Sequence, residues 1–112
     1  MSDVRFAPDA NSIYLKLKKS KDKIDQSIFN SINEKIEQLK QNPKIGEPLQ
    51  KKFIPEKYIQ KHGIKNLFKI RLTNYWRLLY TLSNNNEINV LIFIVDIIDH
   101  DEYNDIFGFK KK

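Results

Sequence analysis

The sequence contains no cysteine, only three glycines and no long hydrophobic run. Without cysteine, a disulfide framework and thiolate chemistry are both excluded, and the composition suits a reducing cytoplasm, where we expect the protein to act. The longest apolar run, residues 90–95, has the length of a strand and falls short of the roughly 18–20 residues of a membrane span. The N-terminus shows no apolar signal segment, and no glycine-rich phosphate loop or Ser-His-Asp pattern is present.

Arginine is also scarce, and its placement is uneven. The chain has 17 lysines and three arginines, and two of the three, Arg71 and Arg77, lie in one stretch. Residues 44–77 hold nine basic and two acidic side chains, a local balance of +7, whereas residues 96–105 hold five acids and no lysine or arginine. The basic segment favours contact with phosphate, and a solvated lysine-rich loop is the alternative.

The first half of the chain predicts a strand and two helices within one domain, residues 1–112. A short strand at residues 4–6 precedes a helix that starts at Pro8, although alternation at positions 13, 15 and 17 also allows a strand. The clearest helix covers residues 22–41, and Asn42-Pro43 ends it. Its apolar stripe, which we expect to pack on the protein's own sheet, comprises Ile24, Ile28, Phe29, Ile32, Ile36 and Leu39.

The second half predicts mainly strands, which gives an α+β order. Residues 44–66 form a loop with one short helix at 55–61. Strands follow at residues 67–72, 76–82 and 88–98, the last two joined by a Ser-Asn-Asn-Asn turn, and a short helix is expected at 101–107.

The hairpin formed by the first two of these strands places its arginines together. Alternate apolar residues on both strands must face the helices, so Leu72 should lie opposite Trp76. That register puts Arg71 opposite Arg77 and leaves a three-residue loop between the strands. Such loops usually need one residue in the left-handed region, and Asn74 is the best candidate.

Two arginines directly across a strand pair repel each other by roughly a few tenths of a kcal/mol up to 1 kcal/mol. One explanation is that Asp96, Asp99 or Glu47 neutralises them. The other is that this face binds an anion, because a guanidinium is a flat, permanently charged fork that matches phosphate with two hydrogen bonds. Tyr75 or Tyr103 could then stack on a nucleic-acid base nearby.

Five short segments, spread over most of the chain, together resemble one known group of proteins. They read VRFAPDA, LKQNP, IGEPLQ, FKIRLTNYWRLLY and DHDEY, and the fourth contains an Arg-x-x-x-x-x-Arg-x-x-Tyr pattern that ends at Tyr80. They resemble the RelE/ParE toxin superfamily of type II toxin–antitoxin systems. The resemblance implies an α+β fold, with a small twisted antiparallel sheet of about four strands and two N-terminal helices packed on one face.

The same resemblance implies an activity and partners. Many members cut mRNA on the ribosome and are held inactive by a cognate antitoxin protein. We favour this branch, similar to the RelE and YoeB ribonucleases, over the ParE branch, whose members inhibit DNA gyrase. In the ribonucleases a loop Glu, a hairpin Arg, and a His and Tyr near the C-terminus are catalytic. The matching positions here are Glu47, Arg77, His100 and Tyr103.

RNA cleavage needs a base for the 2′-OH, an acid for the leaving 5′-oxygen, and cations for the charge on phosphorus. Glu47 or His100 could serve as base, and His100 or Tyr103 as acid. We expect further RNA or phosphate contacts from Lys51, Lys52, Lys69, Arg71 and Tyr75.

Several alternatives remain open at this point. His100 could instead cap a helix or pair with an acid. The opposite strand parity of Asp96 and Asp99 argues against a metal site, and we expect no cofactor. Asp101 and Glu102 would repel a phosphate, which favours the alternative of a non-catalytic binding protein of the same fold, either a gyrase inhibitor or a degenerate toxin.

Overall fold

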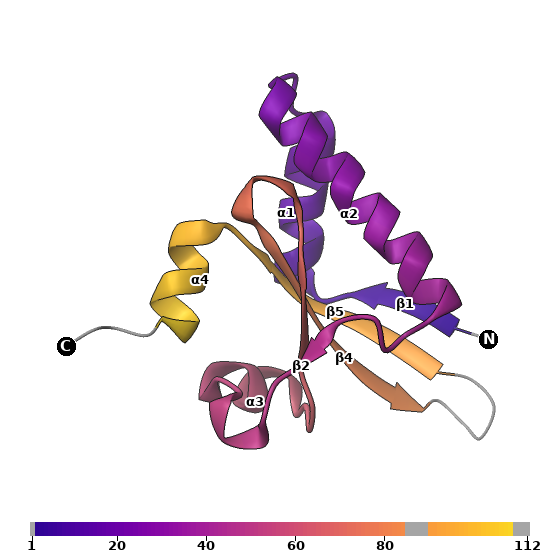
Figure 1. Ribbon diagram of the computed structural model, residues 1–112, viewed down its shortest axis with the longest axis vertical. Helices are drawn as coiled ribbons and strands as arrows, with labels where there is room; N and C mark the ends of the chain where they lie inside the picture. Colours follow the sequence, from indigo (N-terminus) through magenta and orange to yellow (C-terminus); the bar gives the residue numbers. More distant parts are fainter. Residues whose placement is uncertain (1, 85–89, 109–112) are drawn as a thin grey trace.

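The computed structural model describes residues 2–84 and 90–108, and Figure 1 shows how its elements are arranged. The first strand, β1, is Ser2–Phe6, and the helical hairpin after it consists of α1, Pro8–Lys19, and α2, Lys23–Gln41. Pro8 lies in the first turn of α1, where its missing N–H removes no helical bond. Asp22 caps α2 by accepting a hydrogen bond from the Asp25 N–H at 3.0 Å. The structure thus confirms all three predicted elements.

The middle segment has more structure than the sequence predicted. It contains a two-residue strand, β2 (Glu47–Pro48), a 3₁₀ turn, η1 (Lys51–Phe53), and a helix, α3 (Glu56–His62). The helix confirms the one expected at 55–61. Strand β2 was not foreseen, because two residues are too few to show a periodicity.

The remaining elements follow the predicted order. They are β3 (Phe68–Arg71), β4 (Arg77–Asn84), β5 (Val90–Ile98) and α4 (His100–Phe107). The Ser-Asn-Asn-Asn turn was expected at residues 83–86, but Ser83 and Asn84 belong to β4. The rest of that turn and the predicted start of the last strand at residue 88 lie outside the described residues.

The sheet corrects the expected topology in two respects. In the part of the chain that the structure describes it has five strands, in the order β1-β5-β4-β3-β2, where about four were expected. It is mixed, because β1 runs parallel to β5 while the other neighbours are antiparallel. The strand with which β1 pairs depends on how the whole chain folds, and local sequence patterns do not predict it.

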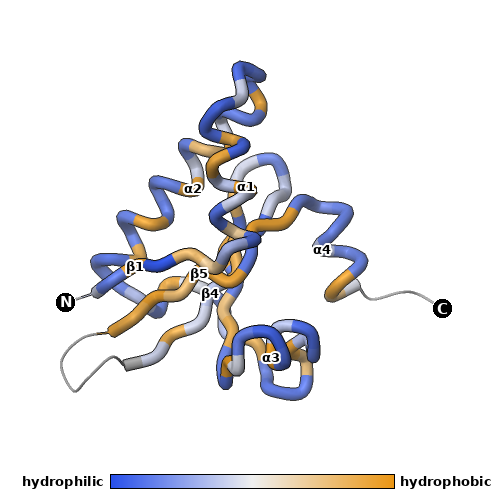
Figure 2. The backbone as a smooth tube through the Cα atoms, turned by 180° about the vertical axis from the view of Figure 1, so that it is seen from behind, coloured by the Kyte–Doolittle hydropathy of each residue, from blue (hydrophilic) through white to orange (hydrophobic). Residues whose placement is uncertain are grey.

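Hydrophobic side chains form a core on each face of the sheet. In Figure 2, β5 is mainly orange, the colour of hydrophobic residues, whereas β4 alternates between pale and orange. The first core joins α1 and α2 to inward residues of β3, β4 and β5, as predicted. The second core lies under α3 and α4. Helices therefore cover both faces and are not confined to the N-terminal half.

One member of the predicted apolar stripe is not buried. Ile24 is 57% exposed, whereas Ile28 and Ile32 are fully covered. Ile24 lies in the first turn of α2, at the end of the helical hairpin that extends beyond the sheet (Figure 1). Within residues 2–84 and 90–108, the structure contains no helix that combines the length and the hydrophobicity needed to cross a membrane.

Candidate functional site

The hairpin of β3 and β4 has the predicted register. Arg71 pairs with Arg77, and the Leu72 N–H donates to the Trp76 carbonyl at 2.8 Å. Asn74 adopts the left-handed conformation with φ 58°, as expected. Tyr75 adopts it too, with φ 65°, which the sequence did not predict. The two arginines therefore lie side by side on the face away from α1 and α2.

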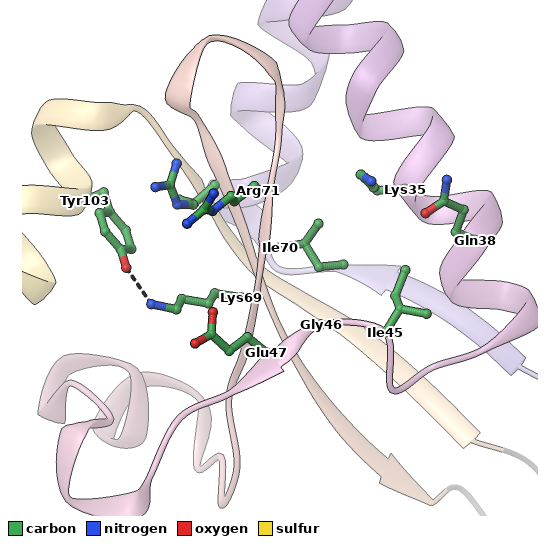
Figure 3. A pocket seen from close by; sticks show the side chains of 10 residues that line it. Lys35, Gln38, Ile45, Gly46, Glu47, Lys69, Ile70, Arg71 and Tyr103 are labelled. Carbon is green, nitrogen blue, oxygen red and sulfur yellow. Dashed lines mark hydrogen bonds between the residues drawn. The ribbon is translucent and has the colours of Figure 1, made fainter.

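An open pocket of about 370 Å³ lies where this face meets β2, α2 and α4 (Figure 3). Five of the predicted site residues line it: Glu47, Lys69, Arg71, Arg77 and Tyr103. The remaining lining residues are Lys35, Gln38, Ile45, Gly46 and Ile70. One carboxylate, four cations and a phenol from five separate elements thus face the same space. We call this space the basic pocket.

Tyr103, from α4, bridges two cations of the basic pocket. Lys69 Nζ donates a hydrogen bond to its phenolic oxygen at 2.6 Å, drawn as the dashed line in Figure 3. The same nitrogen lies 5.3 Å from the ring centroid. It therefore lies in line with the C–O bond, beyond the hydroxyl oxygen, and not above the face of the ring. The Arg77 guanidinium carbon lies 4.6 Å from that centroid, within the range of a cation–π contact.

The arginine pair is not neutralised by the expected acids. The Asp96 carboxylate accepts hydrogen bonds from the Tyr58 hydroxyl at 2.7 Å and the Ile97 N–H at 2.9 Å. Asp99 caps α4 by accepting from the Glu102 N–H at 2.8 Å. Across residues 2–84 and 90–108, no ion pair within 4 Å includes either arginine or Glu47. Among the described residues, none of the three acids therefore forms an ion pair with Arg71 or Arg77, which argues against neutralisation and leaves the paired charges available to an anion.

Arg77 is oriented by its own turn. Its Nη1 donates to the carbonyl oxygens of Tyr75 at 3.0 Å and Trp76 at 3.2 Å. These two bonds hold the guanidinium against the hairpin end, and its central carbon lies over the Tyr103 ring. Arg71 is exposed, so its fork is accessible from solvent.

His100 does not line the basic pocket. It is exposed at the start of α4, where its Nε2 lies 3.2 Å from the Asn104 amide nitrogen. Its ring centroid lies 5.7 Å from that of Tyr75, which is 71% exposed. These two predicted residues therefore form a separate pair at the hairpin end. The described residues contain no cluster of three or more side chains suited to hold a metal ion.

Lys51 and Lys52, the predicted phosphate contacts in the 3₁₀ turn, do not line the basic pocket. Lys52 lines a second groove of about 480 Å³ that shares Glu47, Lys69 and Tyr103 with the basic pocket. Phe53, 57% exposed, lines the same groove. Lys51 is exposed and lines neither space.

The sequence did not predict that side chains of α2 line the basic pocket. Lys35 and Gln38 line the basic pocket, although they flank the buried stripe of a helix that was expected only to cover the sheet. No local signal marks them, because their neighbours in the pocket belong to β2 and β3. Their role depends on how α2 lies beside the edge of the sheet.

A buried hydroxyl supports the loop before Glu47. Tyr80 is 0% exposed, and its hydroxyl donates to the Pro43 carbonyl at 2.7 Å and accepts from the Gly46 N–H at 3.0 Å. Burial raises the pKa of Tyr80 to about 12, so the hydroxyl keeps its proton at neutral pH. The Tyr in the Arg-x-x-x-x-x-Arg-x-x-Tyr pattern was the available signal.

The fold and the pocket define a small α+β domain with an exposed cationic site and a single carboxylate in it. The family model of the ParE toxin of the type II toxin–antitoxin system, parDE, matches residues 4–102, most of the chain. The chain belongs to this family and is a type II toxin, which implies an antitoxin partner. This confirms the predicted RelE/ParE superfamily, whereas the RelE-like branch stays a prediction. No curated protein matches the chain.

Proposed function

We propose that this toxin is an endoribonuclease that cleaves mRNA at the basic pocket, with the ribosome presenting the substrate. The observation that carries the proposal is the lining of one pocket by Glu47, Lys69, Arg71, Arg77 and Tyr103. These are the residue types that cleavage of a phosphodiester by its own 2′-OH requires: a base, cations and a proton donor.

In the proposed reaction the Glu47 carboxylate takes the proton of the 2′-OH. The 2′-oxygen attacks the adjacent phosphorus, the bond to the 5′-oxygen breaks, and the products carry a 2′,3′-cyclic phosphate and a 5′-OH. Arg71 and Arg77 stabilise the charge that grows on the phosphoryl oxygens. Because RNA supplies the nucleophile, the residues need only move protons and stabilise charge.

Tyr103 is the proposed acid. Its hydroxyl lies in the basic pocket, whereas His100 lies outside it, so the geometry favours the phenol over the imidazole. Lys69, 2.6 Å from the phenolic oxygen, would stabilise the phenolate that remains after Tyr103 protonates the leaving 5′-oxygen. His100 and Tyr75 then serve as contacts to RNA or ribosome at the hairpin end.

Inhibition of DNA gyrase without RNA cleavage is the second candidate function. Two observations favour it. The matching family model is that of the ParE toxin, and α4 carries Asp101 and Glu102, which repel phosphate. Under this alternative the arginine pair contacts a protein or DNA surface, and Glu47 has no chemical role.

The test is cleavage of a short mRNA by the purified toxin with and without ribosomes, with mass analysis of the product ends. We expect 2′,3′-cyclic phosphate ends, and no cleavage when the nucleotide at the cut site is 2′-deoxy. Glu47→Gln should lower the rate about 10²-fold or more, and Arg77→Ala about 10²- to 10³-fold.

Arg5→Ala is the matched control, because Arg5 is the third arginine and lies on β1, at the far edge of the sheet. It should leave the rate unchanged. A parallel assay of gyrase supercoiling covers the second candidate. Blocked supercoiling with intact RNA would reject the nuclease proposal and favour inhibition of DNA gyrase as the function.

A further inference from the structure

The segment that carries Glu47 is attached to the hydrophobic core through one hydroxyl. Tyr80 Oη donates to the Pro43 carbonyl and accepts from the Gly46 N–H, at 2.7 Å and 3.0 Å. The Tyr80 ring is itself immobilised, because it is fully buried and stacks on Phe68 with centroids 5.0 Å apart. The loop is thus bonded to a point inside the core.

The contact at residue 46 also depends on glycine. A Cβ at that position would lie 2.7 Å from Tyr80 Oη, 2.8 Å from its Cε1 and 3.1 Å from Ile70 Cγ1. Any side chain would therefore force the backbone away from Tyr80. Gly46 directly precedes Glu47, so a shift there moves the carboxylate.

Glu47 is held on its other side by the sheet. It pairs with Lys69, Pro48 pairs with Phe68, and the Leu49 N–H donates to the Leu67 carbonyl at 2.9 Å. Among the described residues, no hydrogen bond or ion pair holds the Glu47 carboxylate itself. Its position in the basic pocket therefore follows from the backbone on either side.

We propose that Tyr80 is a positioning residue that holds Gly46 and thereby places the Glu47 carboxylate in the basic pocket. The inference rests on the proposed function for the claim that this placement matters to catalysis. Tyr80→Phe isolates the effect, because it removes the hydroxyl and both hydrogen bonds but keeps the stacked ring. Tyr58→Phe is the matched control, since Tyr58 is also buried and donates one hydroxyl bond, to Asp96, in the second core.

The first measurement is amide hydrogen exchange at Gly46, which does not depend on activity. Tyr80→Phe should speed this exchange at least about tenfold, because the N–H loses its only acceptor among the described contacts. Tyr58→Phe should leave it unchanged. An unchanged Gly46 exchange rate in Tyr80→Phe would overturn the proposal.

The second measurement separates positioning from a general loss of structure. Tyr80→Phe should lower kcat about tenfold to a hundredfold while KM changes little, because the phosphate-contacting cations stay in place. In a Glu47→Gln background the same change should cost nothing further, since there is no base left to misplace. An equal loss in both backgrounds would mean that Tyr80 does not act through Glu47, and would overturn the proposal.

The two experiments also separate this inference from the proposed function. A wild-type chain that cuts no RNA would reject the nuclease proposal alone. The Gly46 exchange rates would then decide by themselves whether Tyr80 sets the position of the loop.

Discussion

Two segments complete the basic pocket, and the protein holds them in different ways. The loop before β2, which brings Glu47, is bonded to the buried hydroxyl of Tyr80. The helix α4, which brings Tyr103, has no fully buried residue and packs on the second core through partly exposed side chains. In the pocket the Tyr103 side chain contacts Lys69 and Arg77, and its ring also packs on the second core.

The difference shows how each group depends on the charges of the site. The position of Glu47 is set by the core, so it persists whatever binds to the cations. The position of Tyr103 depends on the same cations that would bind a phosphate, so an anion there competes for Lys69 and Arg77. We therefore expect the Glu47 segment to be the rigid part of the pocket and α4 the adaptable part.

The largest expected difference is in stability. Tyr80→Ala should lower the free energy of unfolding by about 3–5 kcal/mol, because it removes a fully buried ring and both loop bonds. Tyr103→Ala should cost less, about 1–2 kcal/mol, because the ring is only partly buried against the second core and its two cation contacts are partly exposed. Urea unfolding of both variants measures the two values. Equal costs would show that α4 is as firmly attached as the loop.

A smaller effect should appear when α4 alone is loosened. Asp99→Ala removes the cap that accepts the Glu102 N–H and should cost about 1 kcal/mol, mostly as fraying of α4. Amide exchange should then speed up in α4 but not at Gly46. Asp22→Ala, which removes the equivalent cap of α2, is the control and should leave α4 unchanged. Faster exchange at Gly46 in Asp99→Ala would mean that the two segments are coupled.

The smallest effect concerns the acid beside that cap. Partial desolvation, and then the negative charge of Asp96, raise the pKa of the Glu102 carboxyl, although the residue as a whole is exposed. A carboxyl with a raised pKa binds its proton more tightly in the folded state, so the stability it contributes is present at low pH and lost as the pH rises through the folded pKa. Glu102→Gln should therefore stabilise the protein at neutral pH, by less than about 0.5 kcal/mol.

That gain should vanish below the ordinary pKa of glutamate, where wild type is protonated too. Unfolding curves at several pH values measure it. Glu34→Gln, an exposed substitution on α2, is the control for the loss of a surface carboxyl as such. A gain for Glu102→Gln that is the same at all pH values would rule out ionisation as its cause.

The sequence predicted the hairpin in detail. Strand alternation placed Leu72 near Trp76 and Arg71 opposite Arg77, the loop chemistry placed a left-handed residue at Asn74, and the structure confirms each. A period of two excludes every register shifted by one residue, and a shift by two would change the length of the hairpin loop. The second left-handed residue, Tyr75, escaped prediction because no preference of tyrosine marks it.

The composition of the basic pocket could be predicted only in part. Glu47 and Tyr103 were assigned by resemblance to the superfamily, and both line the pocket, whereas His100 was assigned in the same way and lies outside it. His100 and Tyr103 follow the end of β5 by two and by five positions, and they point in different directions because both lie in α4. The capped start of α4 turns His100 toward Tyr75 and Tyr103 toward Lys69.

The sequence by itself determined the elements and the faces of the hairpin, because periodicities of 2.0 and 3.6 are local properties that burial makes strict. Only the tertiary structure decided the order of the five strands, the pairing of β2, and which distant groups meet. The Tyr80–Gly46 and Lys69–Tyr103 contacts each join residues 34 positions apart. Such contacts depend on how whole elements pack, and no local pattern records that packing.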